Sequence, residues 1–144
     1  MKTTLTVAVA TLASLLTPMG ASAEETALTD AVLIELNAVK PIDGGCTLTF
    51  LALNGHAGQI DKAVYETVLF DTAGQVDRLT LFDFGTLPPG RPRVRQFSVT
   101  GLTCEGLGQV LINGAHTCEA PGLPASACEA DLKLETRTKI EVIG

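Results

Sequence analysis

The segment from Asp131 to Val142 constrains the fold of this 144-residue chain most, because two kinds of side chain alternate there without exception. The odd-numbered positions are all charged, and the even-numbered ones are aliphatic or threonine: Leu132, Leu134, Thr136, Thr138, Ile140 and Val142. A period of two puts every second side chain on the same face of a β-strand, whereas a helix would scatter them around its circumference. We therefore predict one continuous strand over residues 131–142, with one packed and one solvated face.

Earlier segments follow the same period less strictly. The predicted strands cover residues 31–37, 46–53, 64–71, 75–84, 93–99 and 109–113. Asp71-Thr72-Ala73-Gly74 predicts a hairpin turn, in which Asp opens the turn and Gly takes a positive φ. Residues 114–130 show no strand pattern, and no run of ten or more residues has a helical period. About seven short strands without helices predict an all-β fold, a two-sheet β-sandwich, with a small barrel as the alternative.

The first 23 residues have the layout of a signal peptide. Lys2 precedes an apolar run over residues 5–16, and Ala21-Ser22-Ala23 is the small-x-small pattern that signal peptidase cleaves. The run is shorter than the ~20 residues of a membrane span. We therefore predict a signal peptide over residues 1–23, cleavage after Ala23, and a single soluble periplasmic domain over residues 24–144.

The charge balance argues against two classes of partner. All 16 acidic residues follow Ala23, with 9 of the 10 Lys and Arg residues, so the expected mature chain has a formal charge of about −7. Nucleic acids and anionic membrane surfaces both select basic patches. We therefore expect neither as a partner of the mature protein.

An exported chain meets an oxidising environment, so its four cysteines are expected to form disulfides. Three pairings are open. Cys118 and Cys128 enclose a segment with Pro and Gly, which favours a local bridge there and leaves Cys46 with Cys104. The alternative is a metal site that adds His56 and His116 as ligands, but the spacings match no zinc pattern.

The sequence carries no recognisable catalytic signature. Ser98 and Ser126 are the only serines after Ala23, and neither lies in G-x-S-x-G. Asp71, Asp77 and Asp83 fall on one predicted hairpin without the spacing of a calcium loop. We therefore predict no catalytic residue, no bound metal and no cofactor, and we assign the three Asp residues to turns and solubility.

Three arginines stand out against this acidic background. Arg91, Arg93 and Arg95 share one face if their segment is a strand, and Arg78 of the preceding strand is placed to join them. Such a patch can bind a carboxylate or an acidic segment of a partner protein. The alternative is an edge strand that charge and Pro92 protect from aggregation. We expect His56, after the turn dipeptide Asn54-Gly55, to be an exposed loop residue.

An Asn-bearing turn at Asn54, the hairpin 64–76, the turn 87–90 and Phe97 follow one another in a characteristic order. This order resembles the FxLYD-type layout, an immunoglobulin-like sandwich of bacterial envelope proteins. The resemblance covers about residues 45–99. It implies an immunoglobulin-like sandwich for this chain.

A second resemblance spans nearly the whole mature chain. Its elements are Glu35–Asn37, Cys46, Leu69–Asp71, Gly85–Arg91, Gln96–Phe97, Gly101–Leu102, Cys104, Gly108–Asn113, Cys118, Cys128 and Thr136–Thr138. They are similar to a family of small exported proteins labelled "Tat pathway signal sequence domain protein", often encoded beside ExbB/ExbD-like proton-channel proteins. The resemblance implies an envelope accessory of a TonB-type energised uptake system. Because Met1-Lys2-Thr3-Thr4 lacks a twin arginine, we expect export by the general secretory route.

These observations lead to one leading expectation for function and two alternatives. The leading one is a non-enzymatic periplasmic accessory or protein-interaction module that binds another envelope protein, such as an ExbB-, ExbD- or TonB-like component. The first alternative is a small-ligand or metal-binding protein that uses the end loops 54–56 and 113–116. The second is a secreted hydrolase whose acid–base groups meet only in the folded chain.

Overall fold

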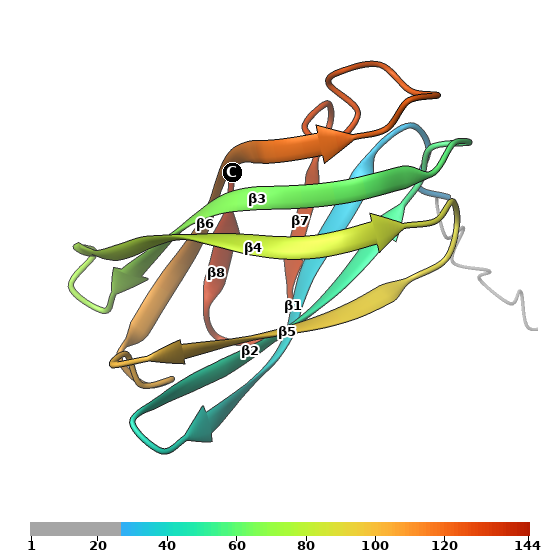
Figure 1. The fold of residues 1–144 in the computed structure, drawn as a ribbon. Helices are drawn as coiled ribbons and strands as arrows, with labels where there is room; N and C mark the ends of the chain where they lie inside the picture. The colour runs from blue at the N-terminus through green and yellow to red at the C-terminus, as the bar shows by residue number, and fades with distance from the viewer. Residues whose placement is uncertain (1–26) are drawn as a thin grey trace, which may run out of the picture.

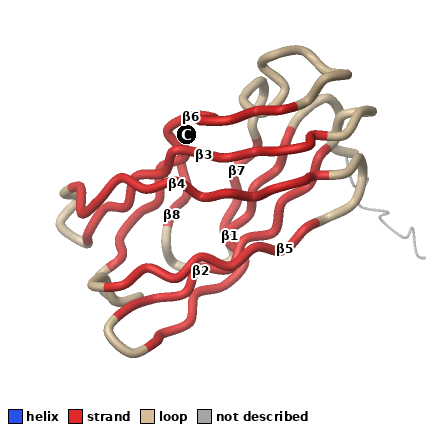
Figure 2. Tube along the Cα trace, in the orientation of Figure 1, coloured by secondary structure: helices blue, strands red, loops and turns tan. Residues whose placement is uncertain are grey.

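The computed structural model describes residues 27–144, so the expected signal peptide and its cleavage site lie outside the described residues. Eight β-strands and no helix occur between residues 27 and 144 (Figure 2). The strands are β1 (Val32–Ile42), β2 (Gly45–Asn54), β3 (Ile60–Asp71), β4 (Val76–Leu87), β5 (Arg93–Thr100), β6 (Leu107–Glu119), β7 (Lys133–Thr136) and β8 (Glu141–Ile143).

The strands form two four-stranded sheets packed face to face (Figure 1). Sheet A has the order β5-β2-β1-β7, and sheet B has the order β4-β3-β6-β8. The prediction of a two-sheet β-sandwich is thus confirmed, with eight strands instead of about seven. The edge strands β4 and β5 contact each other along one side of the sandwich, and the short strands β7 and β8 meet along the other.

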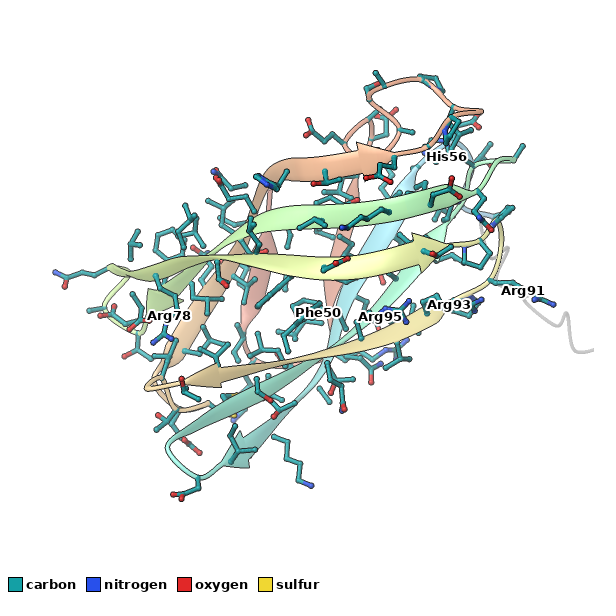
Figure 3. All side chains as sticks on the ribbon, viewed as in Figure 1. Phe50, His56, Arg78, Arg91, Arg93 and Arg95 are labelled. Atoms are coloured by element: carbon teal, nitrogen blue, oxygen red, sulfur yellow. A yellow bond between two sulfur atoms is a disulfide. The ribbon has the colours of Figure 1, made fainter. Side chains whose placement is uncertain are left out.

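Alternating side chains from both sheets fill the space between them. Sheet A contributes Val32, Ile34 and Leu36 from β1, together with Leu48, Phe50 and Ala52 from β2, and all six are 0% exposed. Phe50 lies at the centre of this core (Figure 3). It packs against Phe82, Phe84 and Phe97 with ring centroids 5.8–6.0 Å apart. A core of this kind fixes the register of each strand, since a slip by one residue would move its apolar side chains into solvent.

The predicted hairpin turn after β3 is also confirmed. Asp71 Oδ1 accepts hydrogen bonds of 2.9 Å from the backbone N–H groups of Ala73 and Gln75. Gly74 takes φ +77°, which an L side chain rarely adopts. The turn therefore orients β4 against β3, with Val68 opposite Leu79 and Glu66 opposite Leu81.

The prediction of one continuous strand over residues 131–142 is wrong. The segment forms β7, which runs parallel to β1 in sheet A, and then β8, which runs parallel to β6 in sheet B. Arg137–Ile140 form the bend between them, where Thr138 N and Ile140 N each donate to a threonine hydroxyl. Alternation specifies which side chains face inward, but it does not specify which sheet the backbone joins.

Two further expectations for the C-terminal half need correction. The strand predicted over residues 109–113 is the centre of β6, which runs for 13 residues from Leu107 to Glu119. Residues 114–119, expected to lack strand structure, pair with β3, and two register shifts there interrupt the alternation. The irregular loop that follows β6 covers residues 120–132.

Both expected disulfides are present. The Cys46–Cys104 bond joins β2 of sheet A to the loop that leads from β5 into β6 of sheet B. The Cys118–Cys128 bond joins the end of β6 to the 120–132 loop. The two bonds therefore connect the two sheets and hold the longest loop against the end of the sandwich.

Candidate functional site

The predicted arginine patch lies along the contact between the edge strands β4 and β5, which we call the β4–β5 seam. Arg95 points across this seam, and its Nε donates to the carbonyl of Phe84 at 2.7 Å. Its Nη2 lies 3.5 Å from the carbonyl of Thr86. Arg95 thus occupies carbonyl groups on the open edge of β4 that a further strand would need for pairing.

Arg78 does not join the other three arginines. Its Nη1 donates to the carbonyl of Thr100 at 2.8 Å, and its Nε pairs with Asp77 at 2.6 Å. Thr100 ends β5 and Arg93 begins it, so the two ends of the seam are roughly 23 Å apart at ~3.3 Å per residue. Figure 3 shows Arg78 at one end of the sandwich, and Arg91, Arg93 and Arg95 toward the other.

Arg91 and Arg93 are the arginines left for a partner at that end. Arg91 is exposed, and Arg93 donates only to the carbonyl of its neighbour Pro92, at 3.1 Å. Between the two ends, the rings of Phe82 and Phe97 stack with centroids 4.1 Å apart and planes 3° apart. Contacts across the seam therefore come from Arg78 at one end, Arg95 toward the other, and the stacked rings of Phe82 and Phe97 between them.

His56 is buried, at 7% exposure, which corrects the expectation of an exposed loop residue. Its backbone N–H donates to Asn54 Oδ1 at 2.9 Å, and its Nε2 lies 2.8 Å from the carbonyl of Ala127. Because a carbonyl only accepts, Nε2 carries the proton. The 120–132 loop covers this position, and no sequence pattern could reveal a contact between residues 71 positions apart.

The two end loops named for ligand binding differ in structure. Asn54 is 0% exposed, and its Nδ2 donates to the carbonyls of Gly58 and Leu87, both at 2.9 Å. Its polar atoms are therefore already paired within the protein. Residues 113–116 lie within β6, where His116 is exposed and the Asn113 side chain donates to Glu66.

Asp71, Asp77 and Asp83 each have a local partner. Asp71 forms the hairpin turn, Asp77 pairs with Arg78, and Asp83 accepts from the backbone N–H of Gly85 at 2.8 Å. Within residues 27–144, no group of three or more His, Cys, Asp or Glu side chains is arranged to hold a metal ion. The three carboxylates thus have the turn-forming and pairing roles of surface residues.

A groove of about 770 Å³ runs over the outer face of sheet A. Leu28, Leu33, Leu51 and Leu53 form its apolar part, while Glu35 and Arg137 lie at its polar part. Its volume falls in the range of ligand sites, ~300–1,000 Å³. Sequence reasoning did not find this groove, because its walls come from five separate segments.

The Glu35–Arg137 pair in the groove is asymmetric in exposure. The side chain of Glu35 is 6% exposed and that of Arg137 is 69% exposed, with Arg137 Nε 2.9 Å from Glu35 Oε1. A hydrogen bond from Asn37 and then the interaction with Arg137 lower the pKa of Glu35, although burial opposes them. Glu35 is therefore ionised at neutral pH, and its carboxylate accepts the hydrogen bond from the Nε of Arg137.

The outer face of sheet B carries a row of apolar side chains across all four of its strands. Leu79 of β4 lies opposite Val68 of β3, Val68 opposite Leu111 of β6, and Leu111 opposite Ile143 of β8. We call these four residues the apolar row. Directly opposite residues in a sheet present their side chains on the same face, so the row runs across all four strands, although Val68 within it is only 7% exposed.

Further apolar side chains widen the row on its β4 side. Val76 is 60% exposed, Leu79 57% and Leu81 47%, while Ile143 at the far end is 36% exposed. These four residues together leave on the order of 350 Å² of apolar side chain exposed, within the ~300–600 Å² of the largest patch on a typical monomer, which is often functional.

The charged side chains nearest the row are acidic, and the basic Lys62 lies farther along β3, where it pairs with Glu119. From Val64 to Phe70, the outward positions of β3 and their partners in β4, β6 and β8 include Glu66, Asp83 and Glu141, and no Lys or Arg. Glu66 and Asp83 lie on one side of the row, and Glu141 lies on the other. The face thus offers an apolar centre between two acidic flanks.

No known protein family, curated protein or solved structure matches this chain. Within residues 27–144, the structure contains no helix long and apolar enough to cross a membrane. Two disulfides in this all-β domain suit a protein that is exported from the cytoplasm.

Proposed function

We propose that this protein is a non-enzymatic, exported protein-interaction module whose binding surface is the outer face of sheet B. The apolar row on that face is the observation that carries the proposal. Val76, Leu79 and Leu81 remain about half exposed or more although the sandwich core is filled. Apolar surface of this extent on a rigid, disulfide-linked domain is typical of a site that another protein covers.

The position of the face supports the same function. β4, which carries the most exposed side chains of the face, is an edge strand whose carbonyls at Phe84 and Thr86 face Arg95. Pairing of a partner strand to this edge is therefore hindered near Arg95, whereas the outer face remains open. Binding through side chains on the face is the mode that this arrangement favours.

We further propose the periplasm as the compartment and an energised uptake system as the setting. The signal-peptide layout of residues 1–23 supports export, and the resemblance to the exported family supports a partner among ExbB-, ExbD- or TonB-like components. A deletion strain should then grow more slowly than its parent under iron, haem or cobalamin limitation. Equal growth of both strains under all three limitations would remove the uptake role and leave the interaction role intact.

In-cell photo-crosslinking tests the interaction role directly. A photoreactive amino acid is placed at Leu79 on the apolar row, and a matched one at Thr47 on the outer face of sheet A, whose hydroxyl meets Ser98. We expect a discrete higher-mass adduct from position 79 and none from position 47. The same adducts from both positions, or none from position 79, would contradict the proposal.

Small-ligand binding is a second candidate, and the groove over sheet A is the observation that favours it. The ligand would lie on Leu33, Leu51 and Leu53 rather than in the end loops. Native mass spectrometry of the protein purified from its own cells tests this candidate. A bound small molecule that Leu51→Glu removes would support it, and an unliganded mass would count against it.

A further inference from the structure

We infer that the outer face of sheet B binds a single short amphipathic segment of another protein that carries Lys or Arg beside its apolar side chains. This inference rests on the proposed function and adds the chemistry of the partner. The apolar row, the acidic flanks and the size of the patch support it.

The apolar row determines what the centre of the partner must present. Leu79, Val68, Leu111 and Ile143 are direct neighbours across β4, β3, β6 and β8, spanning about 15 Å at the ~4.8 Å spacing of strands. Val76 and Leu81 extend the surface along β4. A helix with its side chains is ~10–12 Å across, so a stripe of Leu, Ile, Val or Phe along one side of it can cover most of the ~15 Å that the row spans.

The acidic flanks determine what the rim of the partner must present. Glu66, Asp83 and Glu141 flank the row, and the one basic residue among the paired outward positions, Lys62, lies beyond Asp83 at the end of β3 and is paired with Glu119. A partner with Lys or Arg at its rim gains favourable interactions with these carboxylates, whereas one with Asp or Glu meets like charges. Complementary charge therefore selects a basic segment.

A second copy of this chain is a poor occupant for the same reason. A two-fold dimer through this face would place the same patch on both sides of the interface. Glu66, Asp83 and Glu141 of one copy would then lie near those of the other, and Lys62, the one basic side chain of the face, is too few to compensate them. The face is thus unsuited to symmetric self-association.

The size of the patch favours a segment over a folded domain. On the order of 350 Å² of exposed apolar side chain is well below the ~800 Å² that each partner buries in a standard interface between two domains. An amphipathic segment of 12–15 residues is about the right length to cover the row and reach both flanks, at ~1.5 Å per residue. Contacts of this size give weak, exchangeable binding.

Two synthetic 14-residue peptides test the inference against the protein purified with both disulfides intact. Both carry Leu at helical spacing, and one has Lys and the other Glu at the remaining positions. We expect the Lys peptide to bind at least tenfold more tightly than the Glu peptide at 50 mM salt, and this preference to shrink at 500 mM salt.

Variants locate the binding on the molecule. Leu79→Ser with Leu81→Ser should weaken binding of the Lys peptide at least tenfold, and Glu66→Gln with Asp83→Asn should weaken it several-fold at low salt only. Val94→Ser is the matched control, since Val94 is 58% exposed on the outer face of sheet A. Ile143→Ser provides a second test on β8 if the double Leu variant does not fold, as judged by its thermal unfolding.

The outcomes separate this inference from the proposed function. A preference for the Glu peptide, or equal effects of Val94→Ser and the Leu79 variants, would overturn the basic-segment inference even if crosslinking at Leu79 succeeds. Self-association of the native protein that Leu79→Ser abolishes would overturn it in favour of a second copy. Absence of both peptide binding and crosslinking would overturn the inference and the proposed function together.

Discussion

Replacing Arg95 with Met distinguishes edge protection from partner binding at the arginines. Arg95 lies between β5, where it belongs, and the open edge of β4, where its Nε donates to Phe84 O at 2.7 Å. Met keeps the length of the stem and its packing but removes every donor. The carbonyls of Phe84 and Thr86 then lose their partner in the protein.

The magnitude follows from these contacts. A hydrogen bond from a charged donor contributes about 1.5–3 kcal/mol, and the half-buried position of Arg95 points to the lower part of that range. The 3.5 Å approach to Thr86 O is too long to add much. We therefore expect a loss of about 1.5–2 kcal/mol, which lowers the Tm of a domain of this size by roughly 6–8 °C.

Thermal unfolding followed by circular dichroism measures this loss, and size-exclusion chromatography at rising concentration measures self-association. The control is Arg91→Met, because Arg91 is exposed and its side chain makes no hydrogen bond to the described residues. We expect Arg91→Met to shift the Tm by less than 2 °C, since surface changes are within about 0.5 kcal/mol. Equal Tm values for both variants, with no new oligomer from Arg95→Met, would refute the edge-protection role of Arg95.

Three further predictions concern the rest of the scaffold. Replacing Cys46 and Cys104 with Ala should lower the free energy of unfolding in urea by about 4 kcal/mol. Replacing Cys118 and Cys128, which close a loop with a separation of 10, should lower it by only ~3 kcal/mol. The opposite order would contradict the loop-entropy model. Because its interactions lower the pKa of Glu35 below its ordinary 4.5, the stability that Glu35 contributes is complete above that pH and is lost as the pH falls through the folded-state pKa. The Tm difference between wild type and Glu35→Gln should therefore shrink below about pH 4.5, and a difference that is constant from pH 7 to 3 would be inconsistent with this pairing. Asn54→Ala leaves one buried carbonyl, one partly buried carbonyl and one buried N–H without their partner. It should cost about 3 kcal/mol in the same urea assay, so a loss below 1 kcal/mol would argue against these bonds.

The sequence was sufficient to predict the elements that local patterns determine. Alternation in residues 46–53 gave β2 within one residue at each end, and Asp71 with Gly74 identified the hairpin turn. The cysteine positions also indicated the two bonds, because a short loop with Pro and Gly closes readily. Each of these features depends on residues that are near in sequence or on a simple choice among a few pairings.

Other features depend on contacts that a single sequence does not display. The alternation of residues 131–142 continues through the bend at 137–140, so it could not show that β7 and β8 join different sheets. Two register shifts between β3 and β6, near Gly114 and Ala115, concealed the second half of β6. His56 is buried and hydrogen-bonds to the carbonyl of Ala127, which lies in a loop with no periodic pattern.

The apolar row on sheet B also depends on contacts between strands that the sequence does not display. Val76, Leu79 and Leu81 were visible as apolar residues of one predicted strand, but their exposure was not. Only the register of four strands shows that Leu79 continues through Val68 and Leu111 to Ile143. The division of the arginines between the two ends of the seam likewise depends on which carbonyls of β4 and β5 lie within their reach.

Methyl NMR of the protein during titration with the Lys peptide tests the central claim most directly, because both outer faces report in one spectrum. We expect the largest shifts at the methyl groups of Val68, Leu79, Leu81, Leu111 and Ile143. The outer face of sheet A carries the methyl groups of Leu33, Leu51, Leu53 and Val94. Their chemical-shift changes should be no larger than those of methyl groups in the core. Larger shifts on sheet A than on sheet B, or no shift on either face at saturating peptide, would contradict the account.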